Sequence, residues 1–278
     1  PQQGREMTFK HLSYQKADHI ALVTLDNPER LNAMTGEMLA SLSRAIELVR
    51  EDDDVRVLVL TGAGRGFCSG ADTEMLIALA MGKPVPGAVA QESWHKNLEP
   101  IGWFGVEVSQ LEKPTIAAIN GSAVGGGFAL AMACDLRIIA NDAKFGMAST
   151  HRYALPPEGG ITYTLPRIVG LTRACELLLT GDLVDGMEAE RIGLVTRAVP
   201  ADQVLEAAMA LAAKIAGNGP IGMALTKQLI YRGLHETSIA TQVEREDAAL
   251  VRGFKTEDYR EGATAWWIEK RKPVFKGK

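Results

Sequence analysis

Cysteine is scarce in this sequence, and no two cysteines have the spacing of a metal or redox pair. The three that are present, Cys68, Cys134 and Cys175, lie far apart in the chain. An odd number of cysteines without a C-x-x-C pair argues against a disulfide framework and against a zinc site. We therefore expect buried free thiols in a reducing compartment and no metal.

A strong excess of either charge is also missing, because the formal net charge is −4 over 278 residues. Proteins that bind nucleic acid usually carry clustered Lys and Arg. The one locally basic stretch is the C-terminal EKRKPVFKGK, which is typical of a solvated chain end. We therefore expect no nucleic acid as a partner.

The sequence has no convincing membrane span. Residues 114–134 carry no charge and are long enough to cross a bilayer as a helix. Asn120 and Gly121 interrupt this run, however, and the preceding TIAAIN has the character of a β-strand. Residues 1–10 also lack the apolar centre of a secretory signal. We therefore expect a cytoplasmic protein that does not bind membranes.

Short β runs alternate with helical patterns over the first two hundred residues. Residues 19–25 and 55–62 are apolar runs that indicate strands, the second of them rich in β-branched side chains. Between them, residues 35–53 place apolar side chains at helical spacing, and Thr35 is a suitable N-cap. This alternation predicts an α/β fold with parallel strands.

Beyond Pro200 the chain is mainly helical to its end. Several amphipathic patterns follow one another there without an intervening strand. We therefore divide the chain into a core, residues 1–200, and a helical C-terminal region, residues 201–278.

Two glycine-rich turns, residues 61–72 and 120–127, each follow a β run and open a helix. The first fails the dinucleotide pattern G-x-G-x-x-G because Phe67 stands at the third glycine, and neither turn continues into G-K-[ST]. Glycines at a helix start let an oxyanion approach unpaired N–H groups. Close packing of the second helix against a sheet would demand the same glycines, so both interpretations stand.

Five segments together resemble, in order and spacing, the crotonase superfamily of enoyl-CoA hydratases and isomerases: NPERLNAM, GRGFCSGAD, KPTIAAINGSAVGGG, ACDLRIIANDAKFG and LLLTG with DGMEAERIGLVTRAVP. The resemblance implies an α/β fold, a spiral of repeated ββα units with a helical C-terminal region that mediates homotrimers or hexamers. It also implies an acyl-CoA substrate, with coenzyme A entering as part of that substrate and no permanently bound cofactor.

The resemblance assigns an oxyanion hole for the thioester oxygen to the backbone N–H groups of Ala71 and Gly126. It also implies three contacts to the coenzyme: Arg30, Leu31 and Ala33. Family members often carry a lysine where Glu74 stands, just past the first turn. This difference removes one expected contact to phosphate.

The two glutamates of family hydratases are missing, because their positions correspond to Ala129 and Ser149. Neither side chain can act as a carboxylate base. Glu158 is the remaining carboxylate nearby, in the region where some isomerases of the superfamily carry their acid–base residue. Ser149 itself and His151 are weaker candidates, as are three residues of the segment expected to cover the acyl chain: Glu92, His95 and Glu99.

Three hypotheses therefore remain open. Double-bond isomerisation, with Glu158 moving the proton, fits the residues better than hydration does. Hydration with a different base is the first alternative. The second is an acyl-CoA binding protein that has kept the oxyanion hole and lost the chemistry.

Overall fold

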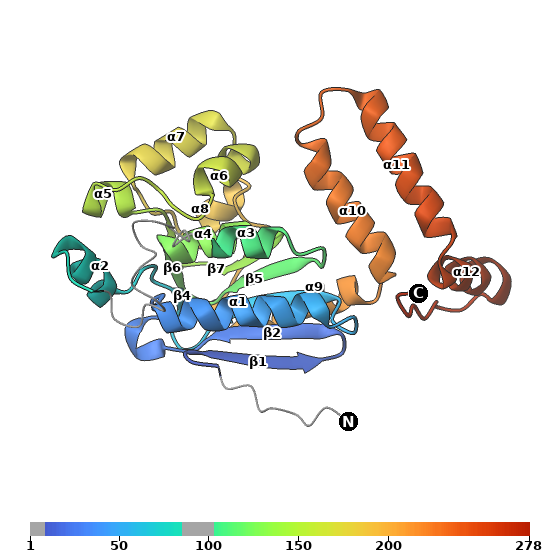
Figure 1. The fold of residues 1–278 in the computed structure, drawn as a ribbon, viewed down its shortest axis with the longest axis horizontal. Coiled ribbons are helices and arrows are strands. Elements are labelled where there is room, and N and C mark those ends of the chain that lie inside the picture. Colours follow the sequence, from blue (N-terminus) through green and yellow to red (C-terminus); the bar gives the residue numbers. More distant parts are fainter. Residues whose placement is uncertain (1–8, 85–102) are drawn as a thin grey trace.

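The computed structural model describes residues 9–84 and 103–278, and its strands form two sheets (Figure 1). The larger sheet has the strand order β1-β2-β3-β5-β7-β9, and the smaller has the order β4-β6-β8. The strands of the larger sheet are β1 (Leu12–Ala17), β2 (Ile20–Leu25), β3 (Val57–Gly62), β5 (Thr115–Ile119), β7 (Leu136–Ala140) and β9 (Arg197–Val199). Except for the β1–β2 hairpin, neighbouring strands are parallel.

Three ββα units follow one another along the chain. In each unit the first strand joins the larger sheet, the second joins the smaller, and a helix follows. The second strands and their helices are β4 (Gly66–Cys68) with α2 (Thr73–Ala80), β6 (Ser122–Val124) with α4 (Gly126–Ala133), and β8 (Phe145–Gly146) with α5 (Ser149–Tyr153). This arrangement confirms the predicted α/β fold of repeated ββα units.

Helix α1 (Gly36–Glu51) forms where the helical spacing predicts it. The Thr35 hydroxyl caps it by accepting from the Met38 N–H at 3.1 Å. Its apolar stripe is buried, including Met38, Leu42 and Ile46. The helix packs beside β1, β2 and α3 (Phe104–Ser109), as its amphipathic pattern requires.

The uncharged stretch at residues 114–134 is β5, β6 and the short helix α4, and all eight residues of α4 are buried. A Cβ on Gly127 would lie 2.2 Å from the Cys68 carbonyl oxygen, so only glycine allows this helix so near its neighbouring strand. No helix among residues 9–84 and 103–278 is both long and apolar enough to cross a bilayer.

Four helices complete the part of the molecule that packs around the sheets: α6 (Ile161–Val169), α7 (Leu171–Thr180), α8 (Gly186–Arg191) and α9 (Val204–Ala216). Helix α9 contacts β3, β5 and β7, and its small apolar face lies in the main core. The predicted boundary near residue 200 thus precedes a helix that packs on the sheet. The division into two regions stays a prediction.

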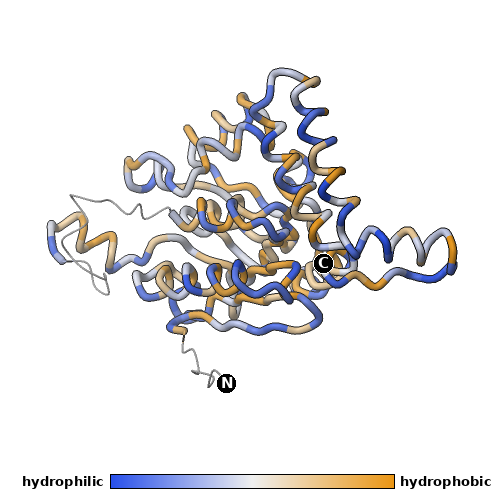
Figure 2. The backbone as a smooth tube through the Cα atoms, turned by 45° about the vertical axis from the view of Figure 1, so that its right-hand side comes forward, coloured by the Kyte–Doolittle hydropathy of each residue, from blue (hydrophilic) through white to orange (hydrophobic). Residues whose placement is uncertain are grey.

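The last helices project from this core as an arm (Figures 1 and 2). Helices α10 (Pro220–Gly233) and α11 (Ile239–Phe254) form an antiparallel hairpin, and α12 (Glu257–Ala263) follows at its base. The arm exposes large apolar side chains, among them Ile239, Phe254 and Trp267. Figure 2 shows hydrophobic residues alternating with hydrophilic ones along the backbone of the arm.

All three cysteines are free, and their exposure differs. Cys68 and Cys134 are buried in the core, and burial raises the pKa of each thiol to about 12. Cys175 on α7 is exposed, so the expectation of buried thiols is wrong for this residue. Its helix packs against α5 and α6 through other residues, among them the buried Ala174 and Leu177.

Candidate active site

The two glycine-rich turns meet at one end of the small sheet. Strands β4 and β6 are parallel neighbours, so their carboxyl ends, and the turns that follow, lie side by side. A Cβ on Gly70 would lie 3.1 Å from the Gly126 nitrogen and 2.8 Å from the Val124 carbonyl oxygen. Gly70 also has φ +94°, a conformation that favours glycine. The sequence therefore brings two backbone turns into direct contact.

The N–H groups of Ala71 and Gly126 belong to these touching turns. Among the hydrogen bonds of the residues that the structure describes, neither group is a donor. On the other edge of the first turn, the Met34 N–H donates to the Gly70 carbonyl at 2.8 Å, and the Asp72 N–H donates to the Met34 carbonyl at 3.2 Å. Gly126 is also the first residue of α4, where the helix dipole is positive. Within residues 9–84 and 103–278, both N–H groups are therefore without an acceptor.

Arg30 lies beside the first turn, at the end of the short helix Pro28–Arg30. Its guanidinium is 2.9 Å from an Asp72 carboxylate oxygen and 3.3 Å from a Glu74 oxygen. Asp72 is buried and caps α2, accepting from the N–H groups of Glu74 and Met75. Glu74 is exposed, and its carboxylate contacts only Arg30 among the ion pairs of the described residues. Arg30 is therefore partly occupied by two carboxylates.

Leu31 and Ala33 follow Arg30 in the same turn. Leu31 has φ +52°, and its carbonyl accepts from the Ser69 N–H at 3.0 Å. Ala33 is buried, and its N–H donates to the Arg30 carbonyl at 3.1 Å. The structure thus places all three residues expected to contact the coenzyme alongside the first glycine turn.

Asn32 holds this arrangement together, and the sequence analysis missed it. Its side chain is fully buried and donates to three carbonyls, those of Ala63, Gly66 and Phe67, at 2.9, 2.9 and 3.2 Å. Its carbonyl accepts from the Asn27 N–H at 2.9 Å. The signal was available, because an asparagine inside NPERLN tolerates a left-handed backbone and can bridge loops.

Glu158 lies on the turn between α5 and α6, and this turn packs on α4. A Cβ on Gly159 would lie only 2.6 Å from the Ala129 Cβ and 3.3 Å from the ring of Phe104. Ala129 is three residues after Gly126, so the two share one face of α4. The Glu158 side chain is half-buried, and burial raises its pKa above the ordinary glutamate value.

The two weaker candidates, Ser149 and His151, lie in α5, the helix that precedes the Glu158 turn. Ser149 begins α5 and is buried, and its hydroxyl has no hydrogen-bond partner among the described residues. His151 is exposed and packs against Gly181 at the end of α7, where a Cβ would lie 2.7 Å from its own Cβ. Glu92, His95 and Glu99 fall outside the described residues. Within residues 9–84 and 103–278, no three His, Cys, Asp or Glu side chains are grouped to hold a metal.

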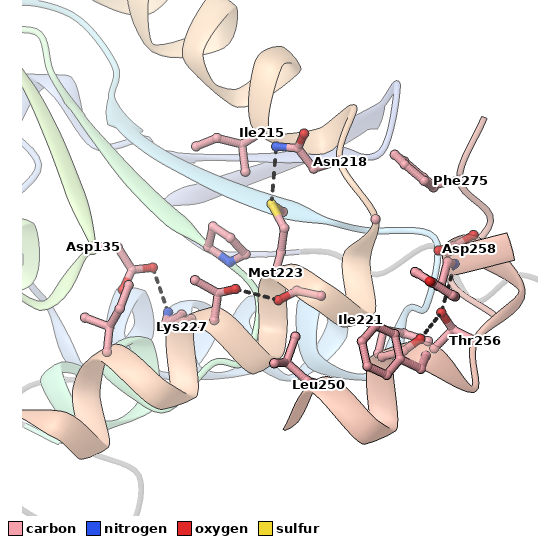
Figure 3. A pocket seen from close by; sticks show the side chains of 18 of the residues that line it. Asp135, Ile215, Asn218, Ile221, Met223, Lys227, Leu250, Thr256, Asp258 and Phe275 are labelled. Carbon is pink, nitrogen blue, oxygen red and sulfur yellow. Dashed lines mark hydrogen bonds and ion pairs between the residues drawn. The ribbon is translucent and has the colours of Figure 1, made fainter. Parts of the chain in front are cut away.

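A separate cavity of about 810 Å³ lies between the core and the arm (Figure 3). Its lining is mainly apolar and comes largely from α10, α11 and the chain that follows. At one end, Asp135 accepts from Lys227 Nζ at 2.7 Å and from the Tyr231 hydroxyl at 2.6 Å. No residue of the two glycine turns lines this cavity. The cavity is therefore separate from the two turns.

Comparisons with known proteins identify the family of this chain. The sequence matches the family described as "Enoyl-CoA hydratase/isomerase" over residues 15–278. It is 39% identical to the "Probable enoyl-CoA hydratase echA12" of Mycobacterium bovis, across 92% of this chain and 89% of that protein. It is 35% identical to the "Crotonyl-CoA hydratase" of Syntrophomonas wolfei, across 97% of this chain and 99% of that protein.

A solved structure has the same architecture. The crystal structure of an enoyl-CoA hydratase from Bacillus anthracis superposes with a TM-score of 0.86 at 35% sequence identity, covering 97% of this chain and all of that one. This likeness confirms the predicted crotonase-type fold. From the extent of the family match and the identity to these relatives, the chain belongs to the enoyl-CoA hydratase/isomerase family.

Proposed function

We propose that this protein is an acyl-CoA enzyme that holds the thioester oxygen at the N–H groups of Ala71 and Gly126 and moves a double bond along the acyl chain. Glu158 carries the proton. The observation that supports this choice is the packing of the Glu158 turn on Ala129, one helical turn from the Gly126 N–H. This packing supports Glu158 as the carboxylate that acts on a thioester held at the proposed oxyanion hole.

The two backbone donors suit a thioester enolate. Removing a proton next to the thioester carbonyl places negative charge on its oxygen. Two fixed donors, one of them at the positive end of α4, stabilise that charge without reorganising. A donor of this kind typically contributes about 3 kcal/mol to the transition state.

Glu158 suits both halves of an isomerisation. Its carboxylate takes a proton from C2 of a 3-enoyl thioester, and the electron pair moves to give a dienolate whose charge rests on the thioester oxygen. The protonated carboxyl then returns the proton at C4, leaving a 2-enoyl thioester and a restored carboxylate. A glutamate whose pKa is raised by burial is a stronger base and a better-matched proton carrier.

Hydration is the second candidate because the relatives named above are hydratases. It requires a base to activate water, and the two positions that carry this role in family hydratases are Ala129 and Ser149. Neither residue ionises, so Glu158 or a residue beyond the described segments would have to serve. A third candidate is an acyl-CoA binding protein without turnover.

Incubation with 2-enoyl-CoA and with 3-enoyl-CoA separates the three functions. Isomerisation keeps the mass of a 3-enoyl-CoA and produces the ultraviolet absorbance of a conjugated thioester. Hydration adds the mass of one water to a 2-enoyl-CoA. We expect the first result, and rapid water addition without isomerisation would reject our proposal. Binding without any product would favour the third candidate.

The same proposal assigns coenzyme contacts to Arg30, Leu31 and Ala33, with coenzyme A arriving as part of the substrate. We also infer that the chain assembles as a homotrimer or hexamer. The support is the arm, whose apolar side chains remain exposed in the single chain, and the apolar cavity at its base (Figure 3). Sedimentation of the purified protein tests this inference, and a monomer would contradict it.

A further inference from the structure

The turn that carries Glu158 continues directly into α6. The Ile161 N–H donates to the Glu158 carbonyl at 3.5 Å, and the Tyr163 N–H donates to the Gly160 carbonyl at 3.0 Å. Gly160 has φ +78° and caps the helix. The backbone from Glu158 to Tyr163 is therefore one hydrogen-bonded unit, and the position of Tyr163 constrains that of Glu158.

Two side chains contact the ring of Tyr163. The Arg167 guanidinium stands 3.7 Å from the centre of the ring and also donates to the Tyr163 carbonyl at 2.8 Å. The ring also stacks on His235, with centroids 5.7 Å apart and planes 28° apart. The Tyr163 hydroxyl is hydrogen-bonded to His235 Nε2. Stacking and the hydrogen bond together specify the orientation of the ring.

His235 comes from the tip of the arm, in the connection between α10 and α11, which Figure 1 shows beside α6. This connection is itself well braced. The Glu236 carboxylate accepts from the N–H groups of Thr237 and Ser238 at 2.9 and 3.0 Å, and it pairs with Arg245 at 2.9 Å. The tip therefore presents His235 from a rigid loop.

Helix α10 is fixed to the core as well. Asp135, just before β7, accepts from Lys227 in the middle of α10 and from Tyr231 in its last turn, and Lys227 also donates to the Lys113 carbonyl at 3.1 Å. Lys227 is buried, so losing its partner would leave an uncompensated charge. With its middle and last turn fixed in this way, α10 holds the tip that follows it in place relative to the core.

We propose that the α10–α11 hairpin positions the Glu158 turn, and that His235 and Tyr163 form the contact through which it does so. His235 and Tyr163 are positioning residues and do not touch the reacting atoms. The proposal rests on the role proposed above for Glu158. Under this proposal, the arm has a function within its own subunit that does not depend on oligomer formation.

Hydrogen exchange of the full-length protein tests whether His235 holds the Glu158 turn in place. His235→Ala removes the stack and the hydrogen bond, and we expect about fivefold faster exchange of the amides from residue 159 to 164, which equals about 1 kcal/mol at 1.4 kcal/mol per tenfold. Arg232→Gln is the matched control, because this α10 side chain makes no hydrogen bond or ion pair among the described residues. Unchanged exchange in His235→Ala would overturn the proposal.

Steady-state kinetics test whether this positioning of the turn affects catalysis by Glu158. Tyr163→Phe keeps the stack and loses the hydroxyl, and we expect kcat to fall by about two- to fivefold with KM unchanged, because one hydrogen bond is lost. In a Glu158→Gln background the same substitution should have no further effect, since the residue being positioned is gone. An equal loss in both backgrounds would overturn the proposal.

The two proposals fail in different ways. If Glu158 has no role, Glu158→Gln alone leaves kcat intact, and that result also overturns the catalytic half of the positioning proposal. The exchange rates then still decide whether His235 holds the turn. If Glu158 is required but His235→Ala leaves exchange and kcat unchanged, only the positioning proposal is lost.

Discussion

The two sides of the candidate site are built differently. On one side, Ala71 and Gly126 offer backbone N–H groups at the ends of two adjacent parallel strands. On the other side, a single half-buried side chain, Glu158, stands on a turn between two helices. The first side depends on strand register and glycine, whereas the second depends on side-chain identity and on packing from distant parts of the chain.

This difference explains how one fold supports several reactions. The backbone side is packed so closely that a Cβ on Gly70 or Gly127 would overlap neighbouring backbone atoms. It can change little without loss of the fold. On the side-chain side, the resemblance places Ala129 and Ser149 where family hydratases carry glutamates, while Glu158 remains on its turn. The proposed function therefore separates activation of the thioester from the proton transfer that follows.

The side-chain half is tested most severely by Glu158→Gln. This change keeps the shape and removes the base, so we expect kcat for 3-enoyl-CoA isomerisation to fall by about 10²–10⁴-fold. Steady-state kinetics with the conjugated product measure it. Glu206→Gln, an exposed glutamate of α9, is the control. Intact turnover in Glu158→Gln would remove this residue from the mechanism.

The backbone half is tested by Gly126→Pro, which deletes the proposed donor. Proline is tolerated at the first residue of a helix, where no helical hydrogen bond is lost. We expect kcat to fall by about 10²–10³-fold in a protein that still folds by circular dichroism. Gly126→Ala is the matched control, because its Cβ would lie 3.0 Å from the Met34 sulfur and 3.7 Å from the Gly70 Cα, and its N–H remains. A fully active Gly126→Pro enzyme would contradict the assignment.

A smaller effect is expected at the mouth of the site, where Glu74 competes for Arg30. Glu74→Lys reverses a charge beside the proposed phosphate contact, and a unit charge at 4 Å contributes about 1 kcal/mol in water. We expect KM for an acyl-CoA to fall by about fivefold at low salt, and by less at high salt. The pantetheine thioester of the same acyl group lacks the nucleotide and should show no change. An equal effect on both substrates would refute a role at the nucleotide.

The smallest effect concerns stability and pH. Burial raises the pKa of Glu158, so the folded protein binds this proton more tightly than the unfolded chain does, and stability is lost as pH rises through that pKa. Glu158→Gln has no carboxyl to ionise, so it avoids this loss of stability and should be more stable than the original protein at pH 7 by less than about 1 kcal/mol. The difference should vanish below about pH 4, where the carboxyl is protonated in both states. Thermal unfolding at both pH values measures it, and a less stable variant at pH 7 would be inconsistent with the raised pKa.

Enzyme activity should also depend on the ionisation of Glu158, but it should rise with pH where stability falls. Only the ionised Glu158 can remove a proton, so kcat/KM should fall as pH drops through its pKa. Because burial raises this pKa, the loss should begin above the ordinary glutamate value of about 4.3. A profile that stays flat down to pH 4 would conflict with Glu158 as the base.

Local features of the fold were predictable because short stretches of sequence determine them. The helix at residues 35–53 and its Thr35 cap appear as the spacing indicated, and the uncharged run at 114–134 contains the expected strand, a second short strand and a buried helix. Exposure of Cys175 was not predictable, because a single residue type does not say which face of α7 meets the core. Asn32 was missed because its three acceptors lie more than thirty residues away.

The amino-acid sequence by itself determined the two glycine turns, the absence of both hydratase glutamates and the α/β order of elements. These depend on glycine's freedom near backbone, on side-chain identity and on hydrophobic periodicity, and each is a local property. Only the tertiary structure decided that Gly159 packs on Ala129, that Glu74 shares Arg30 with Asp72, and that His235 reaches Tyr163. The physical reason is that these contacts join residues about 30 to 70 positions apart, and no local pattern encodes such a distance.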